Sequence, residues 1–290
     1  MENSKNIALV LGSGGARGVA QIAIIEELTK AGFTITSIAG ASIGALIGSV
    51  YAGGNLSGLK KWMQELDYWD VFQLMDFSIS NKGFIKGEKV FDVIDSYLPK
   101  GNIEDLQIPY VAVAADIINK KQVVLNSGNV RDAVRASISI PTILKPVEIN
   151  GTLYVDGSVV NPIPVDLVKR HTNDLLVVVD LNAHIPQDEV KITKSQQSKL
   201  DEVANLFLKW RKKDKSKNNL GLFDMLNESF DLTQDMLAAQ ILNNNKPDIH
   251  IKISRKACDT MDFYKSDKML AIGKDAALKA IEEYHINILA

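Results

Sequence analysis

The first 54 residues alternate twice between a short apolar run and a helical pattern, with glycines at the junctions. Residues 6–11 (NIALVL) form a continuous apolar run, which is typical of a buried parallel strand. Residues 18–32 carry apolar side chains at helical spacing and end in a glycine. Residues 34–40 (TITSIAG) again favour a strand, and residues 42–54 favour a second helix. This order predicts right-handed βαβ units, and so an α/β fold whose mostly parallel central sheet carries helices on both faces.

Later segments continue the pattern. Further strands are predicted at 109–117, 121–128, 152–156, 174–181 and 247–254, and a closing amphipathic helix at 266–285. Residues 186–247 interrupt this alternation of strands and helices. They contain a polar start, a short apolar helix, a basic run and a second helix. Because the strand pattern resumes afterwards, we expect a single domain spanning residues 1–290, with a helical and polar insertion at about 186–247.

The composition excludes several classes of protein. The chain has 290 residues, 46% of them hydrophobic and 23% charged, and its net charge of −2 gives no reason to expect nucleic acid as a partner. The single cysteine, Cys258, cannot form an internal disulfide or a thiolate metal site. No signal-peptide pattern opens the chain, and no run reaches the ~18 apolar residues that cross a bilayer. A cytoplasmic location is therefore expected.

One serine stands between two glycines at a predicted strand-to-helix junction. Gly40, Ser42 and Gly44 fit the pattern G-x-S-x-G, in which a sharp turn exposes a nucleophilic hydroxyl at a helix N-terminus. Small residues at this place also let a helix pack closely against a sheet. Taken alone, the pattern leaves both interpretations open.

A glycine-rich turn follows the first predicted strand at residues 11–18 (LGSGGARG). The dinucleotide pattern fits imperfectly, because Ser13 takes the place of its first glycine and no acidic residue ends the second strand. A phosphate-binding Walker loop also fails, since no Gly-Lys-Ser/Thr follows. Unshielded amides that bind an oxyanion fit better, because neighbouring parallel strands bring both turns to the same sheet edge.

A serine nucleophile needs a base. None of the four histidines has a distinctive setting; they are His171, His184, His250 and His285. Asp156 stands apart because it follows a short predicted strand directly and precedes Gly157 and a proline-braced loop. Taken alone, these residues favour an ordinary Asp-Gly turn.

Three short motifs occur in a fixed order along the chain. Together with two connecting stretches, they resemble the signatures of the patatin-like phospholipase family; the motifs are GSGGARG (12–18), GASIG (40–44) and DGS (156–158), and the connecting stretches are 132–147 and 154–168. The resemblance covers about residues 6–182, and 261–277 extends it toward the end of the chain. Three ordered motifs at compatible separations are far more specific than any one of them.

This resemblance implies a patatin-like fold and a Ser–Asp dyad in place of a Ser–His–Asp triad. Ser42 is then the nucleophile and Asp156 the base that accepts its proton. The implied oxyanion hole consists of Gly14, Gly15, Ala16 and Arg17. For the Arg17 side chain, we favour bracing of the loop over attraction of a lipid phosphate. The implied motif glycines are Gly18, Gly40, Gly44 and Gly157.

The chain departs from the family pattern at three positions. Gly12 stands where an aspartate is usual, Ser13 replaces the first glycine of a run of three, and Ser158 replaces a glycine or alanine. An oxyanion hole built from amides tolerates Ser13, and Ser158 is small enough to fit.

The expected activity is hydrolysis of acyl esters of lipids, of phospholipase A type, without cofactor or metal. A thioesterase or acyltransferase would use the same dyad, and a non-catalytic lipid-binding protein would keep the same fold. Aromatic residues at 62–77 are expected either to line a lipid groove or to belong to the core; they are Trp62, Tyr68, Trp69, Phe72 and Phe77. The basic run 209–217 is compatible with peripheral contact to anionic membrane headgroups, although a solvated loop is favoured.

Overall fold

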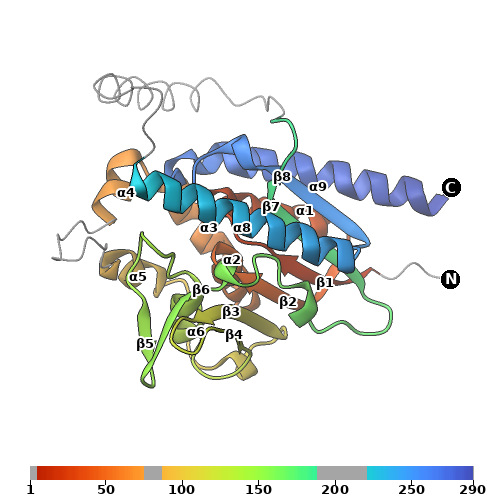
Figure 1. Cartoon of the computed structure of the whole chain (residues 1–290). Helices are drawn as coiled ribbons and strands as arrows, with labels where there is room; N and C mark the ends of the chain where they lie inside the picture. Colours follow the sequence, from red (N-terminus) through yellow and green to blue (C-terminus); the bar gives the residue numbers. More distant parts are fainter. Residues whose placement is uncertain (1–4, 75–86, 188–220, 290) are drawn as a thin grey trace.

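The computed structural model describes residues 5–74, 87–187 and 221–289. A sheet of eight strands forms its centre, in the order β5-β6-β3-β2-β1-β7-β8, with β4 also paired to β3 (Figure 1). The strands are β1 (Asn6–Leu11), β2 (Thr34–Ala41), β3 (Tyr110–Asp116), β4 (Lys121–Leu125), β5 (Val147–Ile149), β6 (Thr152–Asp156), β7 (Leu175–Ala183) and β8 (Ile249–Ser254).

Helices connect and follow these strands. The α-helices are α1 (Val19–Lys30), α2 (Ile43–Ala52), α3 (Leu56–Glu65), α4 (Tyr68–Leu74), α5 (Glu88–Ile94), α6 (Val130–Ser137), α8 (Leu222–Asn244) and α9 (Ser266–Leu289). Short 3-10 helices include η1 (Gly15–Gly18), η3 (Gly157–Val159), η5 (Arg255–Ala257) and η6 (Phe263–Lys265).

Five neighbouring strands, β3, β2, β1, β7 and β8, pair in parallel. The remaining strands, β4, β5 and β6, join the sheet in antiparallel pairs at its β3 end. The connections between parallel strands run through helices, as the alternation of the first 54 residues predicts. The predicted mostly parallel sheet is confirmed.

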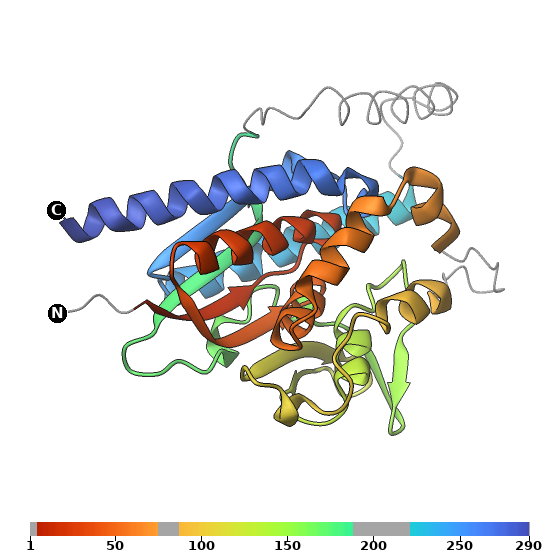
Figure 2. The same cartoon turned by 180° about the vertical axis from the view of Figure 1, so that it is seen from behind.

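Alternating side chains of β1 show that both faces of the sheet are covered. Leu9 and Leu11 belong to the larger core cluster, which includes residues of α1, α2 and α9. Val10 belongs to a second cluster with Val178 of β7 and Ala238 of α8. Helix α8 lies in front of the sheet in Figure 1, and α1 lies in front of it in the reverse view of Figure 2. The prediction of helices on both faces is therefore confirmed.

The register of β3 brings the ends of two other strands together. Along one edge of β3, Val113 pairs with Ala41 of β2, and the next residue, Ala114, pairs with Asp156 of β6. Strand β4 pairs with the opposite edge. Strands β2 and β6 therefore meet end to end beside β3, and the residue after β2, Ser42, comes next to the last residue of β6.

The segment predicted as an insertion is described in part. Residues 188–220 lie outside the described residues, so the domain boundaries and the basic run 209–217 stay predictions. The second predicted helix of this segment is α8, which packs on the sheet. No helix in the described ranges combines the length and the hydropathy that crossing a membrane requires.

Candidate active site

Ser42 occupies a strained turn between β2 and α2. Its backbone angles, φ 57° and ψ −127°, lie in a region that residues other than glycine rarely adopt. The flanking glycines permit this turn: a Cβ on Gly44 would lie 2.1 Å from the carbonyl oxygen of Leu11, and a Cβ on Gly40 would lie 2.5 Å from the carbonyl oxygen of Gly44. Steric contact with backbone therefore explains the G-x-S-x-G spacing.

Asp156 ends β6 and is completely buried. The Ser42 hydroxyl donates a hydrogen bond to Asp156 Oδ2 at 2.5 Å, and the Ser158 amide donates to Asp156 Oδ1 at 2.8 Å. A Cβ on Gly157 would lie 2.1 Å from the carbonyl oxygen of Val113, so glycine is needed after the aspartate. The structure thus brings the two predicted side chains, 114 residues apart in the chain, into direct contact.

Burial raises the pKa of the Asp156 carboxyl to about 6, because the charged form loses its contact with water. Hydrogen bonds from Ser158 and Ser42 act in the opposite direction and stabilise the charged form. The carboxylate is therefore a stronger base than an ordinary aspartate and is still ionised at neutral pH.

The glycine loop, residues 12–18, lies beside Ser42. Gly15 and Ser42 line the same cavity, and Gly15 has a φ of +56°. Two amides of the loop are already engaged: Ala16 N–H donates to the Thr260 carbonyl at 2.8 Å, and Arg17 N–H donates to the Gly14 carbonyl at 3.2 Å. Among the described residues, none accepts a hydrogen bond from the amides of Gly14 and Gly15. Two of the four predicted oxyanion residues therefore have available amides.

The Arg17 side chain is buried and fastens the glycine loop to distant segments. Its guanidinium donates to the carbonyls of Leu181 (3.0 Å) and Cys258 (2.8 Å) and to Asn182 Oδ1 (2.8 Å). A Cβ on Gly18 would lie 2.2 Å from the Ile43 side chain, so the loop also packs directly against the start of α2. The Arg17 guanidinium is therefore occupied within the protein and is not exposed to a lipid phosphate.

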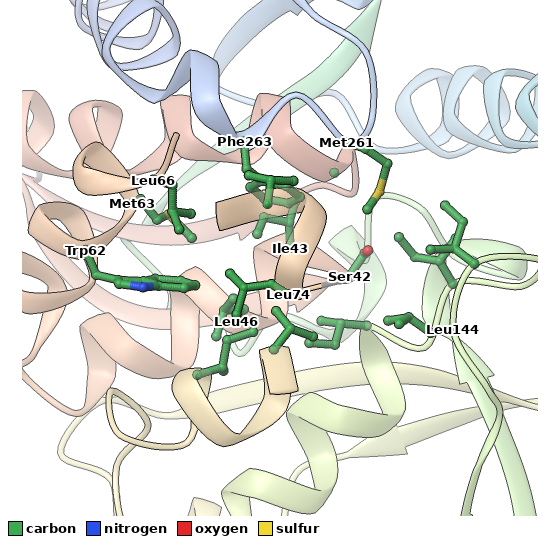
Figure 3. Close-up of a pocket in the computed structure, with 17 residues that line it drawn as sticks. Ser42, Ile43, Leu46, Trp62, Met63, Leu66, Leu74, Leu144, Met261 and Phe263 are labelled. Carbon is green, nitrogen blue, oxygen red and sulfur yellow. The ribbon is translucent and has the colours of Figure 1, made fainter. Parts of the chain in front are cut away.

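An apolar cavity of about 120 Å³ opens beside the Ser42 hydroxyl (Figure 3). Its wall comes from α2, α3, α4, α5, the turn at 138–144 and the segment at 261–263; examples are Leu46, Trp62, Leu74, Leu144 and Phe263. Trp62 lines the cavity, as one of the two interpretations of the aromatic segment expects. Trp69 and Phe72 are instead exposed, and Phe77 lies outside the described residues.

A family model described as patatin-like phospholipase matches residues 9–169, more than half of the chain. The chain belongs to the patatin-like phospholipase family. Membership of this family implies lipid acyl hydrolase activity.

Several proteins of known sequence or structure are similar to this chain. An uncharacterized NTE family protein of Mycobacterium tuberculosis is 29% identical, over 98% of this chain and 94% of that protein. Patatin-like phospholipase domain-containing protein 7 of Rattus norvegicus is 26% identical, over 92% of this chain and 20% of that protein. The crystal structure of VipD from Legionella pneumophila aligns with a TM-score of 0.48 and 13% identity, covering 97% of this chain and 67% of that one.

In this patatin-like domain, no histidine contacts Ser42 or Asp156 among the described residues. His184 Nε2 lies 2.9 Å from Asp235 Oδ2, and His250 Nε2 lies 3.9 Å from Asp180 Oδ2. Burial lowers the pKa of His250 to about 4. His171 binds Asp174 through its backbone amide, and His285 packs against the Tyr284 ring.

Three residues of the site were not predicted from the sequence. Ser137 Oγ accepts a hydrogen bond from the Ser42 amide at 3.1 Å, and the Ser139 carbonyl accepts one from the Asp156 amide at 2.9 Å. Thr260 holds the glycine loop through its carbonyl. The two serines lie within the stretch 132–147, whose resemblance to the family was noted from the sequence. That resemblance did not indicate a role for either serine. Nothing in the sequence marks the Thr260 carbonyl.

Proposed function

We propose that this protein is a serine acyl-ester hydrolase of lipids, of phospholipase A type, which uses Ser42 as nucleophile and Asp156 as base. The observation that carries the proposal is the 2.5 Å hydrogen bond from the Ser42 hydroxyl to the buried Asp156 carboxylate. A nucleophile within hydrogen-bond reach of a base, in a strained turn, is the arrangement that covalent catalysis requires.

In the first half-reaction, Ser42 Oγ attacks the carbonyl carbon of the ester and its proton passes to Asp156. The raised pKa of Asp156 supports this transfer, since a carboxylate of ordinary basicity is a poor acceptor for a hydroxyl proton. The tetrahedral intermediate then collapses, and the alcohol or lysophospholipid leaves with the proton from Asp156. The product of this step is an acyl ester on Ser42.

In the second half-reaction, a water molecule attacks the acyl-enzyme. Asp156 accepts a proton from the water and returns a proton to Ser42 as the fatty acid is released. The Ser158 amide stays hydrogen-bonded to Asp156 Oδ1, which leaves Oδ2 directed at Ser42. One carboxylate oxygen is thus held in place while the other exchanges protons.

We assign the oxyanion hole to the amides of Gly14 and Gly15, a narrower set than the sequence suggests. Both amides lack a carbonyl partner among the described residues, whereas Ala16 and Arg17 donate elsewhere. Fixed donors in a site that excludes water stabilise the charge that develops on the carbonyl oxygen. Arg17 acts on this loop as a brace.

The proposed substrate is a fatty acyl ester or phospholipid, because the cavity beside Ser42 is lined almost entirely by apolar side chains. Contact with a membrane surface fits helix α4, where Trp69 (56% exposed) and Phe72 (44% exposed) lie next to the cavity residues Val71 and Leu74. The cytoplasmic location stays a prediction from the sequence.

The test combines covalent labelling with a substrate panel. A fluorophosphonate should label the purified wild-type protein and leave Ser42→Ala unlabelled, and a panel of carboxyl esters, thioesters and acyl acceptors should show ester hydrolysis as the fastest reaction. Absence of labelling would indicate a lipid-binding protein. Labelling with faster thioester cleavage or acyl transfer would replace the hydrolase by one of those activities on the same dyad.

A further inference from the structure

Two hollows of different character share a wall. The first is the apolar cavity of about 120 Å³ that contains Ser42, and the second is an open hollow of about 380 Å³ lined partly by Glu65, Asp70, Gln73 and Lys89. Both are lined by the same three side chains, Trp62, Leu66 and Leu74. These three residues, which we call the partition, therefore separate an apolar cavity from an open hollow that has both polar and apolar walls.

Trp62 is the largest member of the partition and is held firmly. Its indole stacks on the ring of Tyr97, with 5.6 Å between ring centroids and 26° between planes. The next residue on α3, Met63, is buried and fixes the helix against the core. Figure 3 shows the indole at one end of the cavity, with Leu46 and Leu74 between it and Ser42. We call the part of the cavity between Ser42 and Trp62 its arm. An acyl chain that extends from Ser42 along this arm, past Leu46 and Leu74, meets the Trp62 ring.

We infer that Trp62 closes the acyl-binding arm of the cavity and sets the longest acyl chain that the enzyme accepts efficiently. This inference rests on the proposed function and deepens it by naming the residue that selects the substrate. The arm between Ser42 and Trp62 is apolar, as an acyl chain requires, whereas a polar lysophospholipid leaving group needs access to water. Beyond the partition, the hollow is open to solvent and carries carboxylates and an ammonium group, so methylene groups that reach it stay largely in water.

The expected preference follows from the burial of methylene groups. Each additional methylene that enters an apolar cavity should raise kcat/KM by about fourfold, until the chain reaches Trp62. Longer chains should gain nothing, because their ends must bend back or remain in water. A profile of activity against chain length should therefore rise and then level off or fall.

The experiment measures kcat/KM for a series of soluble aryl esters, from acetyl to palmitoyl, with the wild-type protein and Trp62→Ala. Removing the indole leaves an apolar space where the ring stood, so the longest efficient chain should become longer by the few methylenes that fill this space, with up to about fourfold gained for each. Hydrolysis of the acetyl ester should change least, because its chain does not reach the partition, so kcat/KM for each longer ester is divided by the acetyl value of the same variant. Trp62→Phe, which keeps a ring in place, should largely restore the wild-type limit.

Two further variants keep the result interpretable. Tyr284→Ala truncates a partly buried aromatic residue on α9 that lines neither hollow, so it should leave the chain-length limit unchanged. Leu74→Ala opens the same partition from α4 and should shift the limit in the same direction, even if Trp62→Ala does not fold.

The possible results separate the inference from the proposed function. A wild-type protein that hydrolyses esters, with the same chain-length limit in Trp62→Ala and Leu74→Ala, overturns the inference and leaves the proposed function standing. A uniform loss for all chain lengths in both variants also overturns it, since a general loosening of the fold explains that result. Hydrolysis that persists in Ser42→Ala, or no hydrolysis by the wild type, overturns both.

Discussion

The two turns that meet at the candidate active site are held in place by different kinds of contact. The Ser42 turn is fixed by close approach of backbone atoms at Gly40 and Gly44, and it carries a positive φ. The glycine loop is closely packed as well, at Gly15 and Gly18, but it is also held by hydrogen bonds that the Arg17 guanidinium donates to segments far away in the sequence. One turn is strained and adjoins a buried carboxylate, whereas the other is stabilised by favourable polar contacts.

This difference separates the contributions of the two turns to catalysis and to stability. The Ser42 turn and Asp156 hold groups in states that cost free energy of folding, as reactive groups often do. The Arg17 contacts contribute to the free energy of unfolding and act on the reaction through the amides that they position. Substitutions in the two turns should therefore affect activity and stability in different proportions.

The largest effect is expected at the dyad. Ser42→Ala removes the nucleophile and Asp156→Asn removes the proton acceptor, so each should lower kcat by roughly 10⁴-fold or more. The double variant should be little worse than either single one, because residues that act as a unit are not additive. Steady-state hydrolysis of a soluble ester measures all three.

Histidine variants provide the control for this assignment. Glutamine at each of the four positions should leave substantial activity, since none of these side chains contacts the dyad among the described residues; the variants are His171→Gln, His184→Gln, His250→Gln and His285→Gln. Loss of activity in one of them, with activity retained in Asp156→Asn, would show that a histidine is the base.

A smaller loss is expected in the glycine loop. Gly15→Ala should lower kcat by roughly 10²–10³-fold, the typical cost of one oxyanion donor. The added Cβ would lie 2.5 Å from the Thr260 carbonyl oxygen, at a φ that alanine disfavours, so the loop must shift. Ser13→Gly should be nearly neutral, because the buried Ser13 hydroxyl has no hydrogen-bond partner among the described residues. The reverse order of effects would contradict our assignment of the loop.

The two turns also differ in how far they were predictable from sequence. The strand–helix alternation and the sheet follow from local apolar patterns, and the strained Ser42 turn follows from glycine spacing within five residues of chain. The anchors of the glycine loop do not, since the carbonyls of Leu181, Cys258 and Thr260 are backbone groups without a sequence signal. For the same reason, the sequence did not predict that the Ala16 amide donates a hydrogen bond to the Thr260 carbonyl.

Opposite effects on stability should distinguish the turns further. Arg17→Met should lower the free energy of unfolding by on the order of 3 kcal/mol, because several hydrogen bonds to a charged group are lost and buried carbonyls stay unpaired. Chemical denaturation at neutral pH measures the loss. Wild-type stability in this variant would show that the guanidinium does not brace the loop.

Asp156→Asn should instead stabilise the fold at neutral pH, by up to about 3 kcal/mol. The folded-state pKa of about 6 lies above the ordinary value of 3.8, so ionising this carboxyl costs more in the folded protein than in the unfolded one. Its cost is absent below pH 3.8 and complete above pH 6. The gain in the variant should therefore grow as pH rises through this window, and a gain independent of pH would contradict the assignment of burial as its cause.

The last prediction concerns the midpoint of the pH profile of kcat/KM, which should depend on Asp156 and not on the glycine loop. Asp156 accepts a proton only when ionised, so activity should be constant above about pH 7 and fall about tenfold per pH unit below its pKa of about 6. Gly15→Ala should lower the whole profile without moving its midpoint, because the lost amide does not titrate. A midpoint near 3.8 would mean that Asp156 is not desolvated in the working enzyme. A midpoint that moves in a histidine variant and not in Gly15→Ala would assign the titration to that histidine, and the base would then have to be sought outside the Ser42–Asp156 pair.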